Sequence, residues 1–118
     1  MDLPKTMEME GSVLRNAEWG DMEVAYNTVA KEFDVTPLLK GLPDDMCQSP
    51  HWGYVFKGSI KMITKDGKDI FKAGDIYYMP PGHSGVIGAD SEWIEFSPKE
   101  KQKVTNEAIK RNLDAMQK

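Results

Sequence analysis

Cysteine and histidine number only three in this chain, and two of them lie in a run of polar residues at alternate positions. Asp45, Cys47, Ser49 and His51 are each two residues apart, so on one extended strand their side chains would project to the same face. A thiolate and an imidazole are common zinc ligands, and a carboxylate can complete such a set. The spacing predicts a candidate metal-binding face over residues 45–51, with Asp45 as the weakest ligand.

The elements expected to position these side chains are short β-strands. Aromatic and β-branched residues gather at positions 54–56, 60–64, 76–79, 86–87 and 93–96, and residues 22–26 alternate between apolar and polar types. An Asp66-Gly67 pair between two such runs predicts a hairpin turn. Several short strands separated by turns are typical of a β-sandwich or a barrel.

The end of the chain has a different pattern. Ser97, Pro98 and Glu100 form a helix-start signal, with Ser97 as the N-cap. Apolar residues then recur at helical spacing (Val104, Ala108, Ile109, Leu113 and Met116). This stripe either seals the protein's own β-domain or docks against a dimer partner.

Composition limits the classes of function. The chain has 118 residues, of which 40% are hydrophobic, and this fits one folded domain. A net charge of −4 argues against nucleic acid as the main partner, and no apolar run is long enough to span a membrane. Residues 1–12 read as a flexible polar lead-in without the features of a secretory signal. Because Cys47 is the single cysteine, we expect a reducing, cytoplasmic location.

A strand bounded by glycine and proline occupies residues 74–82, which read GDIYYMPPG. This segment is a full match to one half of the cupin signature, in which a glycine is followed by five residues, a proline, any residue and a glycine. The chain therefore resembles the cupin superfamily, in particular small single-domain cupins with an RmlC-like fold. The resemblance implies an all-β fold: a single cupin-type jelly-roll β-barrel over residues 13–97, followed by a C-terminal α-helix over residues 98–118.

The other half of the cupin signature is altered. With its last glycine placed on Gly58, His51 occupies the glutamate position, while Cys47 and Asp45 occupy the two histidine positions. In the second half, Gly85 stands where the metal-binding histidine is usual, and His83 directly follows the final glycine of the match. The resemblance thus implies the barrel but not the usual site of three histidines and one glutamate.

Inside such a barrel, Cys47, His51 and His83 would meet around a shared ligand. This set suits a divalent metal, with zinc favoured over iron because iron more often takes two histidines and a carboxylate. The ligand pocket is expected to be lined by His51 and His83 together with aromatic residues (Tyr54, Phe56, Tyr78 and Trp93).

Each of these residues also has a purely structural interpretation. His51 could be hydrogen-bonded to a backbone carbonyl, Cys47 could be a small core residue, and His83 could be solvated in its turn. Pro50 could interrupt the strand and so break the alternation of residues 45–51. The aromatic residues could be ordinary core.

Three classes of function remain open. The chain could bind a small organic molecule with an atypical metal site or none, which we favour because the standard metal set is altered. It could instead be a metal-dependent cupin enzyme, such as an oxygenase, an isomerase or a lyase. A third hypothesis is a domain whose main role is association. We expect a homodimer, because the edges of an open sheet need cover.

Overall fold

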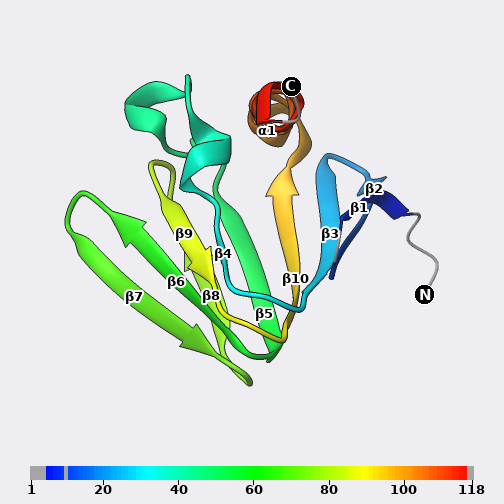
Figure 1. The fold of residues 1–118 in the computed structure, drawn as a ribbon, viewed down its shortest axis with the longest axis vertical. Coiled ribbons are helices and arrows are strands. Elements are labelled where there is room, and N and C mark those ends of the chain that lie inside the picture. Colours follow the sequence, from blue (N-terminus) through cyan, green and yellow to red (C-terminus); the bar gives the residue numbers. More distant parts are fainter. Residues whose placement is uncertain (1–4, 10, 117–118) are drawn as a thin grey trace.

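The computed structural model describes residues 5–9 and 11–116. Within them, two antiparallel sheets face each other, and one long helix follows the strands (Figure 1). The larger sheet has the order β1-β2-β3-β10-β5-β8 and the smaller has the order β4-β9-β6-β7. The elements are β1 (Lys5–Met9), β2 (Ser12–Trp19), β3 (Met22–Val29), β4 (Phe33–Asp34), β5 (His51–Lys57), β6 (Ser59–Thr64), β7 (Gly67–Lys72), β8 (Ile76–Met79), β9 (Ser84–Ile87), β10 (Ser91–Pro98) and α1 (Lys99–Met116), with two 3₁₀-helices, η1 (Thr36–Leu39) and η2 (Pro43–Asp45).

The predicted all-β class with a C-terminal helix is confirmed, although the two sheets do not close into a complete barrel. The hairpin predicted at Asp66-Gly67 joins β6 to β7. The helices α1, η1 and η2 lie at the same end of the molecule, beyond the strands (Figure 1). None of the helices in the described part of the chain has the length and apolar character needed to cross a membrane.

The main core lies between the inner faces of the two sheets. It is a cluster of buried apolar side chains (Val29, Val55, Ile60, Met62, Tyr77, Met79, Ile87 and Trp93). Strand β5 shows how alternation separates the faces: His51, Gly53 and Val55 are buried, whereas Trp52 and Phe56 are exposed. A second cluster joins the loop before β5 to the helix, and it contains Leu39, Leu42, Cys47 and Ala108.

Helix α1 begins at Lys99, two residues after the serine that was predicted to cap it. Ser97 is a buried residue of β10, which runs to Pro98, and its hydroxyl is hydrogen-bonded to His51. The buried helix residues are Thr105 and Ala108, whereas Val104 and Met116 of the predicted stripe are exposed. The helix packs on η1, β10 and β3 of its own chain, so its inner face covers the β-domain.

The expected lead-in over residues 1–12 contains a strand. Residues 5–9 form β1, which pairs with β2 across the turn at Gly11. Pairing gives the backbone of β2 a partner on its outer side, and this outweighs the polar composition of the segment. Residues 1–4 and 10 lie outside the described part.

Gly58 allows the chain to cross from the larger sheet to the smaller. Its φ is +78°, and a Cβ at this position would lie 2.1 Å from Ser91 Oγ and 2.7 Å from Ser91 Cα. Gly74 has a φ of +95° but nothing within 4 Å of its Cβ position. The two glycines therefore share the conformational requirement and differ in the space available.

This pair makes a matched test of close packing. Gly74→Ala should lower the free energy of unfolding by about 1 kcal/mol through the positive φ alone. Gly58→Ala should lower it by about 2 kcal/mol more, because Ser91 must also move. Urea denaturation measures both losses. Equal losses would show that the contact with Ser91 does not affect the free energy of unfolding.

The outer face of β5 and β8 carries an apolar group, which we call the outer patch (Trp52, Tyr54, Phe56, Ile76 and Tyr78). Trp52 and Tyr78 have ring centroids 5.4 Å apart, and Ile76 is 83% exposed. Strand β8 is the last strand of its sheet, so the patch is continuous with a free edge. A second copy of the chain packed against this face would cover the patch with its own.

The homodimer stays a prediction, which these residues make testable. Sedimentation equilibrium at micromolar concentration should give a dimer, and Ile76→Glu should shift it to monomer while leaving the fold intact. Ile70→Glu is the control, because Ile70 is 58% exposed on β7 of the other sheet. A monomeric parent protein, or equal dissociation by both variants, would contradict a dimer formed through the outer patch.

Candidate functional site

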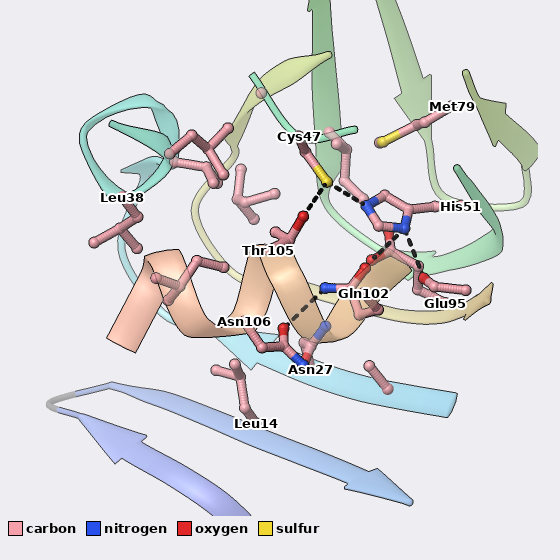
Figure 2. A pocket seen from close by; sticks show the side chains of 18 of the residues that line it. Leu14, Asn27, Leu38, Cys47, His51, Met79, Glu95, Gln102, Thr105 and Asn106 are labelled. Atoms are coloured by element: carbon pink, nitrogen blue, oxygen red, sulfur yellow. Dashed lines mark hydrogen bonds and ion pairs between the residues drawn. The ribbon is translucent and has the colours of Figure 1, made fainter. Parts of the chain in front are cut away.

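A cavity of about 220 Å³ lies between the two sheets and beneath α1. Its walls are largely apolar and include Leu14, Val29, Leu38, Ile60 and Leu113. Polar side chains enter it from β5, β10 and the helix (Figure 2). A mostly apolar cavity with a few convergent polar groups is typical of a small-ligand site.

Cys47 and His83 are brought together by a short antiparallel bridge between two loops. The backbone N–H of Cys47 donates to the carbonyl of His83 at 2.8 Å, and the N–H of Gly82 donates to the carbonyl of Cys47 at 2.8 Å. Gly82 has a φ of +87°, which turns the chain after Pro80 and Pro81. The loop geometry, and not strand alternation, therefore places the thiol beside this histidine.

His51 reaches the same point from the first position of β5. Its Nε2 lies 3.6 Å from Cys47 Sγ, and its ring lies 4.7 Å from that of His83 at an angle of 71°. One ligand atom of each of the three residues falls within 4.8 Å of the others, and all three residues are buried. Cys47 and His51 are visible side by side in Figure 2.

Each imidazole is held through its second nitrogen. His51 Nδ1 lies 2.6 Å from Ser97 Oγ and 3.7 Å from Glu95 Oε2, and the Tyr77 hydroxyl donates to the other oxygen of Glu95 at 2.7 Å. His83 Nδ1 lies 2.7 Å from the carbonyl oxygen of Pro80, which can only accept, so this nitrogen carries the proton. Both rings therefore have Nε2 left for a ligand, as in metal-binding histidines oriented by outer partners.

The electrostatics favour a thiolate at Cys47. Burial raises the pKa of this thiol, but hydrogen bonds and charge interactions with His51 and His83 outweigh burial and lower the pKa to about 6. Burial lowers the pKa of His51, yet the carboxylate of Glu95 and the thiolate of Cys47 raise it overall. The site thus holds the deprotonated sulfur that a metal requires.

The three side chains fit a soft divalent cation. One thiolate and two imidazoles are ligands typical of zinc, and a set of three protein ligands leaves one position for water or a guest. Thr105 Oγ1 lies 3.3 Å from Cys47 Sγ, so α1 also contacts this group. Within the described residues, the metal-binding group contains these three side chains only.

Asp45 does not join them, so its prediction as a weaker ligand is corrected. Residues 45–51 do not form one strand, because Asp45 belongs to η2 and has a φ of +55°, while β5 begins at His51. Its exposed carboxylate accepts a hydrogen bond from the backbone N–H of Gly41 at 3.0 Å.

The structure places some of the predicted pocket residues at the cavity and the others on the outer face of the larger sheet. His51, His83 and Trp93 line the cavity. Tyr54, Phe56 and Tyr78 do not, because they occupy the alternate positions of β5 and β8 and belong to the outer patch.

Several residues of the cavity were missed at the level of sequence. Glu95 and Ser97 share the inward alternation of Trp93, and this spacing would have placed them beside His51. Asn16 and Glu23 come from β2 and β3, and Gln102, Thr105 and Asn106 come from the inner face of α1. The three helix residues have helical spacing, but they are polar and so do not belong to the apolar stripe that predicted the inner face of the helix.

Comparisons with known proteins bear on the fold alone. No family model matches the chain, and no curated protein matches its sequence. Among solved structures, a Salmonella typhimurium protein described as ethanolamine utilization protein Q has a TM-score of 0.54 at 14% identity over 78% of this chain and 77% of its own. An RmlC-like cupin from Shewanella frigidimarina has a TM-score of 0.57 at 15% identity, over 82% of this chain and 85% of its own.

An oxalate decarboxylase from B. subtilis is also similar, with a TM-score of 0.55 at 15% identity, over 82% of this chain but 27% of its own. All three likenesses cover more than three quarters of this chain. The cupin resemblance of residues 74–82 is therefore confirmed at the level of architecture: the chain has the cupin fold.

Proposed function

We propose that this protein binds a small organic molecule in its cavity, beside a divalent cation held by Cys47, His51 and His83. The observation that carries the proposal is the convergence of a thiol and two oriented imidazoles, with ligand atoms within 4.8 Å, on the wall of a cavity of about 220 Å³. Buried titratable groups in a cavity are strong candidates for function.

Zinc is the favoured cation. Thiolate is a soft ligand that zinc accepts readily, whereas non-haem iron sites more often use two histidines and a carboxylate. The nearest carboxylate, Glu95, lies on the Nδ1 side of His51 and is bonded to Tyr77, so it orients the imidazole and does not face Cys47. When bound, the cation would act as a Lewis acid and lower the pKa of a coordinated water.

The protein's own residues would prepare this site. Ser97 and Pro80 fix the rings of His51 and His83, so little ordering is needed when the cation arrives. The apolar walls would exclude water and take up the apolar part of the guest.

A second candidate function is a metal-dependent cupin enzyme. Three protein ligands with a remaining position facing a cavity are the pattern of catalytic zinc sites. Architectural similarity to an oxalate decarboxylase agrees with such chemistry but does not identify a reaction. Turnover of any bound guest would distinguish this function from binding alone.

Cobalt substitution tests the metal proposal directly. Metal-free protein should bind one Co²⁺ and develop the near-ultraviolet charge-transfer band of a cobalt–thiolate bond. Cys47→Ser should remove that band, and His51→Ala or His83→Ala should weaken binding by more than roughly tenfold, because each removes a direct ligand. Ser49→Ala is the control, because the buried Ser49 hydroxyl donates to the Pro50 carbonyl and, among the described residues, has no hydrogen bond to the three ligands.

The same sample tests whether the site faces the cavity. Added azide should change the visible cobalt bands, since an external ligand can take the remaining position. A spectrum that azide leaves unchanged would indicate a closed structural site, and a thiolate band that survives Cys47→Ser would overturn the assignment.

Ser97→Ala tests the orientation of His51. The variant keeps all three ligands but loses the hydroxyl 2.6 Å from His51 Nδ1, so Co²⁺ affinity should fall roughly 10–100-fold at unchanged stoichiometry. Titration followed by absorbance measures this, with Ser49→Ala again as the control. Unchanged affinity would mean that Glu95 alone orients the ring.

A further inference from the structure

A second polar group lines the same cavity, and it shares no residue with the thiol and the two imidazoles. We call it the amide cluster, and it consists of Asn16 on β2, Glu23 on β3, and Gln102 and Asn106 on α1. All four side chains line the cavity, and Figure 2 shows Gln102 and Asn106 linked on the inner side of the helix. Nothing in the metal proposal requires these residues.

In the amide cluster, the Glu23 carboxylate determines which group donates each hydrogen bond and which group accepts it. An ionised carboxylate can only accept, so the amide groups beside it must turn their NH₂ toward it. Asn106 Nδ2 donates to both Glu23 oxygens, at 3.2 and 3.1 Å, and Asn16 Nδ2 donates to Oε1. Asn106 Oδ1 is then directed to Gln102, whose Nε2 donates to it at 2.9 Å.

With the amides oriented in this way, two of their oxygen atoms have no hydrogen-bond donor in the described part of the chain. Asn16 Oδ1 and Gln102 Oε1 are buried and have no hydrogen-bond partner among the described residues. Buried polar atoms are nearly always paired, because an unpaired one loses its bond to water without compensation. Turning either amide around would set its NH₂ away from the acceptor that fixes it, so rotation does not remove the mismatch.

The charge of the cavity also favours a guest that carries hydrogen-bond donors. Among the described residues that line it are two carboxylates, Glu23 and Glu95, and no lysine or arginine. A carboxylate or a phosphate on a guest would be repelled by Glu23 and could not bond to the two free oxygens. A group with several N–H donors and a positive charge would satisfy both free oxygens and balance Glu23.

We propose that the amide cluster binds the ammonium group of a small alkylamine, whose apolar part lies along the cavity wall. This rests on the proposed role of the cavity in binding an organic molecule, and it does not depend on the metal. An ammonium has three donors and no acceptor, so its chemistry matches the two free oxygens and the Glu23 carboxylate. An alcohol supplies one donor and no charge, and it should bind more weakly.

The test uses metal-free protein, three four-carbon probes and NMR of the side-chain amide groups. n-Butylammonium should cause saturable shifts in the NH₂ signals of Asn16, Gln102 and Asn106, with the weak affinity expected of so few atoms. n-Butanol should bind more weakly, and butyrate should not bind at this cluster. Because no metal is present, failure here is separate from failure of the cobalt experiment.

Glu23→Gln should weaken butylammonium binding by roughly tenfold or more, since it removes the charge and frees the amides to turn. Glu32→Gln makes the same change of net charge at an exposed position and should have no effect. If Glu23→Gln fails to fold, Gln102→Met removes one free oxygen at similar volume and should weaken binding several-fold. Absence of butylammonium binding, equal binding of butyrate, or binding unaffected by the variant that folds would each overturn the proposal.

Discussion

The candidate site depends on a single pairing of backbone, that between Cys47 and His83. Neither residue lies in a regular strand, and each belongs to a loop that leaves one sheet and approaches the other. The hydrogen bonds between their N–H and carbonyl groups hold the two loops in register, so the thiol and the imidazole are neighbours regardless of the side-chain chemistry. His51 then needs only the inward position at the start of β5 to complete the group.

Around this pairing, the fold supplies two different environments within one cavity. One group brings together a buried thiol and two imidazoles, whose mutual interactions lower the pKa of the thiol and favour its thiolate form. The other group is built on Glu23, whose carboxylate accepts hydrogen bonds from the amides around it and so orients them. Helix α1 contributes to both groups, through Thr105 beside Cys47 and through Gln102 and Asn106 in the amide cluster.

The architecture could be predicted from sequence because its signals are local. The glycines and prolines of residues 74–82, the hairpin at Asp66-Gly67 and the apolar runs each determine a short piece of backbone. Bringing Cys47, His51 and His83 together was expected, but for a partly mistaken reason. Strand alternation over residues 45–51 would have included Asp45, and the actual pairing of two loops leaves it at the surface.

The orientation of the aromatic residues and the role of the helix could not be predicted in the same way. Which alternate positions of β5 face inward depends on the register with β8 and β10, and this is a long-range property. Ser97 had the local features of a helix cap, yet the strand continued through it and its hydroxyl bonded to a histidine 46 positions earlier. The amide cluster consists of four residues from three elements, so no local sequence pattern predicts it.

The alternation of β5 has a structural consequence. His51 points into the cavity and the adjacent Trp52 points out, so one peptide unit separates the buried imidazole from the exposed indole. A strand is a single layer of backbone, and adjacent residues place their side chains on its two sides. A partner bound over Trp52 would therefore contact the residue next to His51 in the chain, so a single strand separates the outer patch from the cavity.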